Sequence, residues 1–267
     1  IIAAQEVSER IQKGENLGPL AGVPIAVKDQ YWTKGILTSN GSNVYKDFVP
    51  SEDSTVIQRL RSAGGVLIGK LNLSELAMGG TQNPPWGTPA NPWNFQCTPG
   101  ESSSGSGVAL AAHLCAASIG EDTGGSGRGP ASYCGVVGFK PTFGHLSVAG
   151  VKPLSQSLDT LGCFVRSAVD LQIFRQAIWN VAGEESPDKN FPKIGFCRTP
   201  DWEKAGSSTQ NALEHARQTW SSQGVEIIDV QLPEEFSALG DAHGCIMVYE
   251  AGQNLRYELS HHQSLLS

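Results

Sequence analysis

Residues 99–128 read PGESSSGSGVALAAHLCAASIGEDTGGSGR, with two Ser/Gly clusters on either side of an apolar, helix-length segment. Each cluster holds a serine that folding could bring to the same point. Far upstream, Lys28 follows the apolar run PIAV, so its stem is expected to leave a buried strand. A desolvated lysine loses its charge more easily and can act as a base. Two serines and a lysine, with no histidine beside them, therefore indicate a nucleophilic hydrolase.

The composition excludes several classes of protein. With 39% hydrophobic and 17% charged residues, the chain of 267 residues is globular and not disordered. A net charge of −7 without a dense Lys/Arg cluster argues against nucleic-acid binding. No apolar run approaches the roughly 20 residues that a membrane span needs. The scattered cysteines form no CxxC pair, so we expect free thiols and a reducing, cytoplasmic location.

Strand and helix patterns alternate along the chain. Strands are expected at residues 22–27, 65–68, 193–197 and 225–230. Helices are expected at residues 1–13, 54–63, 72–77, 106–117, 168–181 and 207–223. A long loop rich in Pro, Asn and Trp is expected at residues 82–100. This alternation predicts an α/β sheet with helices on both faces.

One motif is misleading. Residues 64–71, GGVLIGKL, match the GxxxxGK of a phosphate-binding loop, but Leu71 replaces the Ser or Thr that holds Mg²⁺. The residues between the glycines are apolar and strand-like, whereas a phosphate cradle needs loop backbone with free N–H groups. We therefore expect a strand here and no nucleotide site.

The segment DTGGSGR, residues 122–128, could by itself contribute to catalysis. Glycines around a serine allow backbone conformations that other residues resist, and they expose N–H groups able to bind a developing oxyanion. A flexible turn is the alternative interpretation of this segment taken alone. Likewise, the serines of residues 102–106 could merely cap a helix, and Lys28 could be a surface lysine. The combination of all three favours a catalytic site.

Four segments resemble the amidase signature family. They are GPLAGVPIAVKD (18–29), AGGVLIGKLNLSELAM (63–78), PGESSSGS (99–106) and DTGGSGRGPASYCGVVGFKPTFG (122–144). The resemblance runs from about residue 18 to about residue 170, then weakens. It implies the family's fold, a mixed β-sheet covered by helices on both faces. It also implies that residues 1–267 form a single domain that lacks a C-terminal part and a little of its N-terminus.

The resemblance assigns roles residue by residue. Ser126 would be the nucleophile, Ser102 the bridging serine reached through a cis peptide after Glu101, and Lys28 the base. The oxyanion hole would be formed by Thr123, Gly124, Gly125 and the Ser126 amide. The remaining implied roles are loop support by Asp122 and Arg128 and substrate contact by Met78, Gly79 and Gly80. No metal and no cofactor is implied, because two serines and a lysine suffice for acyl transfer.

Three residues depart from the family pattern. Glu101 stands where the family usually has glycine, and Glu121 replaces a small residue before Asp122. Gly127 replaces a branched apolar residue, which should enlarge or loosen the pocket there. These departures concern pocket shape and local charge more than the three catalytic candidates.

The implied function is hydrolysis of the C–N bond of a carboxylic amide through an acyl-enzyme on serine. The substrate would be a small-molecule amide, ester or carbamate, and a homodimer is left open. One alternative is the amidase subunit of a glutamine-dependent amidotransferase, which passes ammonia to a partner. Another is a degenerate family member that binds amides without catalysis.

Overall fold

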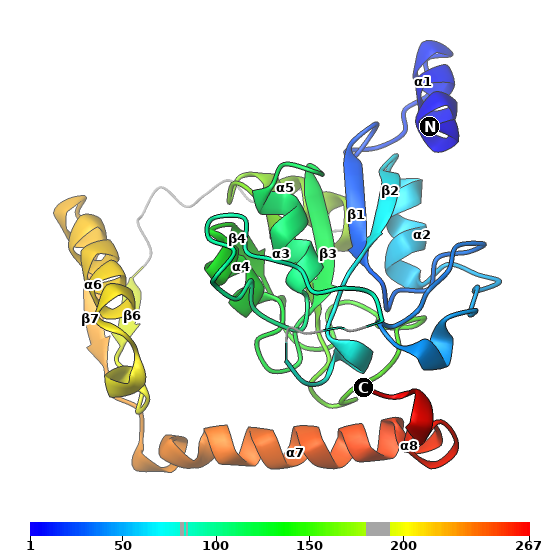
Figure 1. The fold of residues 1–267 in the computed structure, drawn as a ribbon. Coiled ribbons are helices and arrows are strands. Elements are labelled where there is room, and N and C mark those ends of the chain that lie inside the picture. The colour runs from blue at the N-terminus through cyan, green and yellow to red at the C-terminus, as the bar shows by residue number, and fades with distance from the viewer. Residues whose placement is uncertain (81–82, 84, 180–192) are drawn as a thin grey trace. The chain divides into compact units, whose positions relative to one another are not determined.

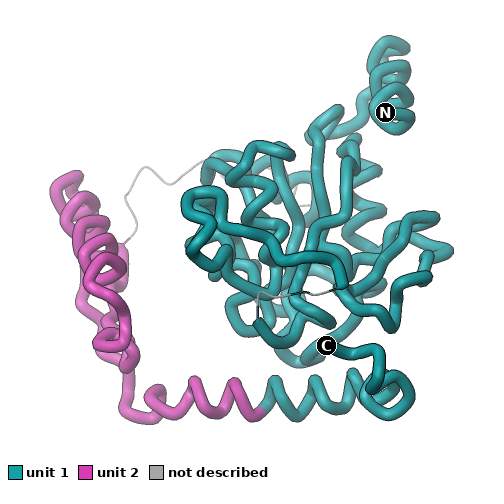
Figure 2. The backbone as a smooth tube through the Cα atoms, viewed as in Figure 1, with its two compact units in different colours: residues 1–182, 246–267 teal, residues 183–245 magenta. Residues whose placement is uncertain are grey.

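A computed structural model describes residues 1–80, 83, 85–179 and 193–267. The chain forms two compact units (Figure 2). Unit 1 comprises Ile1–Ala182 and Ile246–Ser267, and unit 2 comprises Gly183–Cys245. That residues 1–267 form a single domain stays a prediction.

Unit 1 is built on a five-stranded sheet with the order β2-β1-β3-β5-β4 (Figure 1). Its strands are β1 (Pro24–Lys28), β2 (Val66–Leu71), β3 (Ala117–Glu121), β4 (Val137–Phe139) and β5 (Leu161–Val165). Strand β1 runs parallel to β2 and β3, whereas β5 runs antiparallel to β3 and β4. The sheet is therefore mixed, as the resemblance implied.

The helices that belong wholly to unit 1 are α1 (Ile2–Gln12), α2 (Thr55–Ser62), α3 (Ser104–Ala111), α4 (Arg128–Cys134), α5 (Asp170–Phe174) and α8 (Arg256–His261). Helix α7 (Leu239–Asn254) begins in unit 2 and ends in unit 1. Single 3-10 turns occur at Asn43–Tyr45, Glu75–Ala77 and Gln263–Leu265, and a π-helical turn at Arg175–Trp179.

Helices cover both faces of the sheet. On one face, Ile57 and Leu60 of α2 and Phe174 of α5 pack against the strand residues Val27 and Ile119. The opposite face carries α3 and α4, whose Leu110 and Ala131 pack with Ala26 and Phe164. The prediction of an α/β sheet with helices on both faces is confirmed.

Unit 2 is a small α/β unit. Strands β6 (Ile194–Cys197) and β7 (Ile227–Val230) pair in parallel, and α6 (Ser207–Ser222) connects them. Short 3-10 turns lie at Trp202–Lys204 and Glu234–Ala238. The predicted strands at 193–197 and 225–230 and the helix at 207–223 are confirmed in position.

The predicted helix at 106–117 is wrong in its second half. Helix α3 ends at Ala111, and His113 takes a left-handed conformation with φ of 58°. Residues Ala117–Glu121 instead form β3, every residue of which is buried. A continuous apolar run fits a buried helix and a buried strand equally well, so periodicity could not separate them.

Two other predicted helices are shorter than expected. Residues 72–77 contain only the turn Glu75–Ala77, because Leu76 and Ala77 have positive φ angles. In the predicted helix at 168–181, α5 passes into the wider turn Arg175–Trp179, and residues 180–181 lie outside the described ones. In the predicted loop at 82–100, the residues that the structure describes form no helix or strand.

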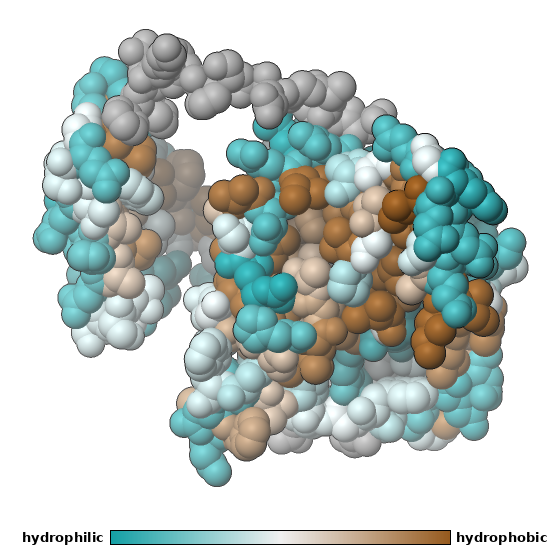
Figure 3. Space-filling view, turned by 90° about the horizontal axis from the view of Figure 1, so that it is seen from above, coloured by the Kyte–Doolittle hydropathy of each residue, from teal (hydrophilic) through white to brown (hydrophobic). Residues whose placement is uncertain are grey.

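The surface of unit 1 mixes apolar and polar side chains. Figure 3 shows hydrophobic side chains gathered between hydrophilic ones on the face it presents. Among the large apolar side chains, Trp93 and Phe95 are 73% and 80% exposed. Of the helices in the described ranges, none is both long and apolar enough to cross a membrane.

Candidate active site

Lys28 is the last residue of β1, a strand flanked on both sides by β2 and β3. Its side chain is fully buried, and Nζ donates a hydrogen bond of 2.7 Å to Ser102 Oγ. Burial lowers the pKa of Lys28 from 10.5 to about 8, although the carboxylates of Glu121 and Asp159 act in the opposite direction. A lysine with such a pKa can exchange a proton near neutral pH.

Ser102 is held in place by close backbone packing. The peptide bond between Glu101 and Ser102 is cis, as the resemblance implied, and the Ser102 carbonyl accepts from the Ser74 amide at 3.2 Å. At Gly105 in α3, a Cβ atom would lie 2.6 Å from the backbone of Asn72. Only glycine allows this approach, and the Gly105 amide donates to Asn72 O at 3.0 Å. The start of α3 is thereby fixed beside Lys28.

The loop between β3 and α4 carries Ser126 and is organised around Asp122. This carboxylate is fully buried and accepts hydrogen bonds from the Gly125 amide and from the amide, Nε and Nη2 of Arg128, at 2.8–3.0 Å. Burial alone would raise the pKa of Asp122, but the hydrogen bonds from Arg128 outweigh it and hold that pKa below its usual range. The contacts are those expected of a pair that supports the loop.

A cavity of about 880 Å³ brings the candidate residues together. Its lining includes Ser102, Ser126, Thr123, Gly124, Gly125, Arg128, Met78, Gly79 and Gly80. Lys28 and Asp122 do not line it, since they lie buried behind Ser102 and the Ser126 loop respectively. All eleven residues named from the sequence thus line this cavity or support its wall.

The backbone donors near Ser126 are not equivalent. The Gly125 amide already donates to Asp122 Oδ1, so in this geometry it is engaged within the loop. The Thr123 hydroxyl donates to Asp159 Oδ1 at 2.7 Å. The amides of Gly124 and Ser126 make no such contact within the described residues, and both residues line the cavity.

Sequence reasoning missed several residues of the site. Asp159 is buried and accepts from Thr123 Oγ1 and from the amides of Leu154 and Ser155, so it holds the start of the Ser126 loop. Tyr133 of α4, Met247 of α7 and Leu154 line the cavity. Tyr133 lies inside the family-like segment 122–144 but was given no role from it, and Asp159, Leu154 and Met247 belong to none of the four quoted segments.

The expectation for Gly127 is wrong. Gly127 is buried and is not among the described residues that line the cavity. A Cβ atom there would lie 3.1 Å from Asp122 Cβ. The glycine therefore affects how Asp122 packs and does not widen the pocket.

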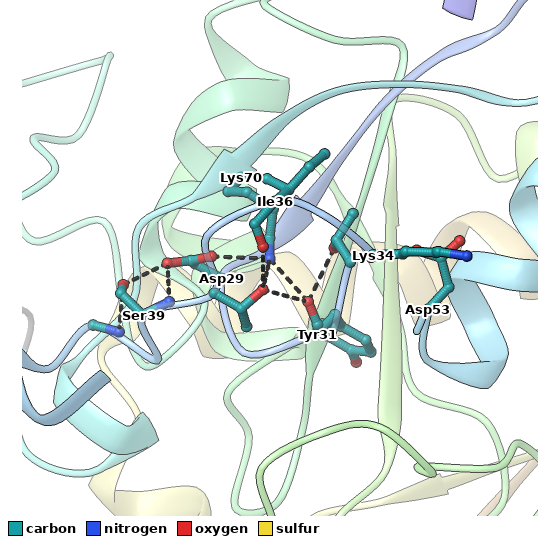
Figure 4. Close-up of polar contacts among 10 residues, drawn as sticks. Asp29, Tyr31, Lys34, Ile36, Ser39, Asp53 and Lys70 are labelled. Atoms are coloured by element: carbon teal, nitrogen blue, oxygen red, sulfur yellow. Dashed lines mark hydrogen bonds and ion pairs between the residues drawn. The ribbon is translucent and has the colours of Figure 1, made fainter. Parts of the chain in front are cut away.

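Lys70, at the end of the GxxxxGK stretch, belongs to a polar network with the segment that follows β1 (Figure 4). Lys70 lies in strand β2, and its Nζ pairs with Asp29 Oδ1 at 2.9 Å and donates to Tyr31 O at 2.8 Å and Thr38 Oγ1 at 2.9 Å. Asp29 also accepts from the Ser39 amide. As predicted, the stretch is a strand, and its lysine fixes the segment that follows Lys28.

Across the parts of the chain that the structure describes, no three His, Cys, Asp or Glu side chains are grouped so as to hold a metal ion.

The sequence and the fold match those of known proteins. A family model described as Amidase matches residues 1–266. A glutamyl-tRNA(Gln) amidotransferase subunit from Desulfatibacillum aliphaticivorans is 39% identical over 286 aligned residues, covering 96% of this chain and 56% of that protein. A crystal structure of an amidase matches with a TM-score of 0.88 and 32% identity, covering 99% of this chain and 60% of that one.

A second solved structure, native peptide amidase from Stenotrophomonas maltophilia, matches with a TM-score of 0.83 and 32% identity. The match covers 97% of this chain and 58% of the peptide amidase chain. This chain thus spans 56% of the length of the curated relative and 58–60% of the two solved chains. The chain belongs to the amidase family.

Proposed function

We propose that this chain carries the catalytic centre of an amidase that hydrolyses a carboxylic amide through an acyl-enzyme on Ser126. The observation that supports the proposal is the buried hydrogen bond from Lys28 to Ser102, directly behind a cavity that Ser126 also lines. Membership of the amidase family supports the choice of a C–N bond. No step requires a cofactor.

In the first half of the reaction, Ser126 Oγ attacks the carbonyl carbon of the amide. The Ser126 proton moves to Ser102 Oγ as the Ser102 proton moves to neutral Lys28 Nζ. The carbonyl oxygen becomes negative and accepts hydrogen bonds from the Gly124 and Ser126 amides. Collapse breaks the C–N bond, and the proton returns from Lys28 through Ser102 to the leaving amine.

The second half uses the same relay on water. Water loses a proton through Ser102 to Lys28 and attacks the ester carbon of acyl-Ser126. The ester bond breaks, Ser126 Oγ recovers the proton, and the carboxylic acid leaves. An ester or carbamate substrate would follow the same path with a different leaving group.

The test is the variant Ser126→Ala, assayed on a panel of aliphatic amides, aryl amides, esters and carbamates. We expect loss of turnover and loss of labelling by a serine-directed phosphonate. Ser132→Ala is a matched control, because Ser132 lies exposed on α4 next to the same loop. Unchanged turnover or labelling in Ser126→Ala would overturn the proposal.

A second candidate function is the amidase subunit of a glutamine-dependent amidotransferase. It is favoured by the 39% identity to a glutamyl-tRNA(Gln) amidotransferase subunit over 96% of this chain. In that function glutamine would be the amide, and the released ammonia would pass to a partner protein. Ammonia release from simple amides by this chain alone, without release from glutamine, would decide against it.

A further inference from the structure

A second buried ionisable group lies beside the candidate base. Glu121 ends β3, directly before Asp122, and its side chain is 1% exposed. Gln30 is also 1% exposed, and its side-chain Nε2 donates a hydrogen bond to Glu121 Oε2. Throughout the described ranges, neither Glu121 Oε1 nor Gln30 Oε1 has a hydrogen-bond partner. Two groups joined by one hydrogen bond thus leave two buried acceptor atoms unsatisfied.

Neighbouring strands explain this pairing. Strands β1 and β3 pair in parallel up to Val27 and Ile119, so Gln30, soon after β1, and Glu121, at the end of β3, emerge at the same edge of the sheet. Glu121 is locked at that edge, because Ser103 Oγ contacts both its amide and its carbonyl at 3.3 and 3.1 Å. Glu121, directly before the Ser126 loop, and Ser103, directly after the bridging Ser102, are therefore held together.

The charges around Glu121 oppose its ionisation. The charged or titratable groups that act on Glu121, or on which it acts, are Lys28 from β1, Tyr31 after β1, and Asp122 and Asp159 from the loops at the Ser126 site. Lys28 is the one cation among these groups, and two of the others are carboxylates. An ionised Glu121 would be one more buried negative charge without a full set of donors, which is costly.

A proton on Glu121 would supply a donor where Glu121 Oε1 and Gln30 Oε1 are now both acceptors. A protonated carboxyl group gains one O–H donor, and Gln30 Oε1 is an acceptor without one. An acid–amide pair then has two hydrogen bonds in place of one. An ionised carboxylate cannot supply the second bond, because it is an acceptor only.

We propose that Glu121 is a positioning residue that holds a proton in an acid–amide pair with Gln30 and so lowers the pH at which Lys28 becomes neutral and able to accept the Ser102 proton. The proposal rests on the proposed function, since it assigns Lys28 the part of a base. It adds that the protonation of Lys28 is controlled by Glu121, a residue that contacts neither the substrate nor the reacting atoms.

Burial keeps the proton on Glu121 to higher pH than in an ordinary glutamate. Burial, helped by Asp159, raises the pKa of Glu121 to about 7, and burial lowers the pKa of Lys28 to about 8. Loss of the Glu121 proton places a negative charge near Lys28 and raises the Lys28 pKa, so the lysine takes a proton and stops being a base. A protonated Glu121 thus lowers the pH at which Lys28 becomes a base.

The test is the pH dependence of kcat/KM for Glu121→Gln in the full chain. Glutamine keeps the shape and a donor for Gln30 but can never become negative. Without that charge the Lys28 pKa falls, so we expect the acidic limb to move to lower pH by about half a unit or more, with plateau activity kept within about threefold. A limb that does not move, or a plateau that falls further, overturns the proposal.

Glu258→Gln is the matched control. Glu258 is also a 1% exposed glutamate, and its Oε2 has no hydrogen-bond partner among the residues that the structure describes, but its Oε1 contacts Lys152 and Tyr45. Its replacement should leave the acidic limb in place even where it lowers stability. A limb that shifts equally in Glu258→Gln would mean that loss of any buried glutamate has this effect, and the proposal would fail.

A titration of the wild-type carboxyl ¹³C signals tests the proton itself and does not depend on activity. We expect one glutamate with a midpoint near 7, absent from Glu121→Gln or, should that variant not fold, from Glu121→Ser. A Glu121 signal that titrates in the usual range for glutamate overturns the proposal. If Ser126→Ala stays active, the proposed function fails while this titration still reports on Glu121.

Discussion

Lys28 Nζ lies 2.7 Å from Ser102 Oγ, and both side chains are buried. A lysine in this position is useful as a base only when it is neutral, since a charged ammonium group has no lone pair to accept a proton. The hydrogen bond therefore links the chemistry of the site to the protonation of one buried residue.

We expect Lys28→Met to lower kcat/KM by about 10²–10⁴-fold, because it removes the proton acceptor. In the wild type, kcat/KM should rise with pH through about 8, where Lys28 loses its proton. The measurement is a pH–rate profile for a neutral amide. Lys34→Met serves as the control, since Lys34 is exposed and its side chain has no part in the site. Comparable losses in both variants would contradict the prediction.

The same residue should make stability depend on pH. The folded chain holds the Lys28 pKa at about 8, below its ordinary 10.5, so between these values the unfolded chain binds more protons. The free energy of unfolding should therefore rise with pH across this window and become flatter in Lys28→Met. Urea denaturation at several pH values checks this. A slope unchanged by the substitution would show that Lys28 is not its cause.

The Ser126 loop should depend on Asp122 for its structure. Asp122→Asn weakens several hydrogen bonds to a fully buried group, so we expect unfolding to become easier by about 2 kcal/mol at neutral pH. Because the Asp122 pKa is lowered on folding, its stabilisation is present above the ordinary value of 3.8 and is lost as pH falls below it. Asp201→Asn, which removes an exposed pair with Lys204, should change stability by less than about 0.5 kcal/mol.

How far the sequence predicts this molecule depends on whether a feature is local. The site serines and Lys28 stand in recognisable motifs with glycines that the loop needs, so they could be predicted. Strand β3 could not be separated from α3, because the apolar run is continuous and the break at His113 involves neither Gly nor Pro. The two short strands β4 and β5 lack a clear period.

Pairs of residues that only the fold brings into contact could not be predicted from the sequence either. Asp159 acts through contacts with Thr123 and with backbone amides about five residues before it, and no spacing in the sequence indicates them. Gln30 and Glu121 are 91 residues apart and meet because β1 and β3 are neighbours. Glu121 stood out as a departure from a family pattern, but its partner could not be named.

The packing of α3 gives a prediction about backbone approach. Gly105→Ala would place a Cβ atom 2.6 Å from the backbone of Asn72, which cannot move aside as a flexible side chain could. We expect a loss of about 1–3 kcal/mol and reduced activity, because Ser102 lies just before this helix. Gly252→Ala in α7 is the control, since a Cβ there meets nothing within 4 Å. It should be neutral or stabilise by up to about 1 kcal/mol.

Glu101 should influence which substrates enter the cavity. It is exposed, lines the cavity, and its Oε2 would lie 3.8 Å from a Cβ atom placed at Gly80. The other charged residue in the described lining, Arg128, is paired with Asp122, so the Glu101 carboxylate leaves this part of the wall negative. The interaction energy between such a charge near water and a charged substrate group about 4 Å away is about 1 kcal/mol.

We therefore expect Glu101→Gln to raise kcat/KM for an anionic amide about fivefold relative to a neutral amide of the same shape, and to lower it for a cationic one. The ratio between matched substrates is the quantity to measure, because it cancels effects on folding and on the chemical step. The effect should shrink at high salt, where exposed charges are screened. Glu203→Gln, on an exposed turn of unit 2, should leave the ratio unchanged. A ratio equal in wild type and Glu101→Gln would show that substrate charge is not sensed at this wall.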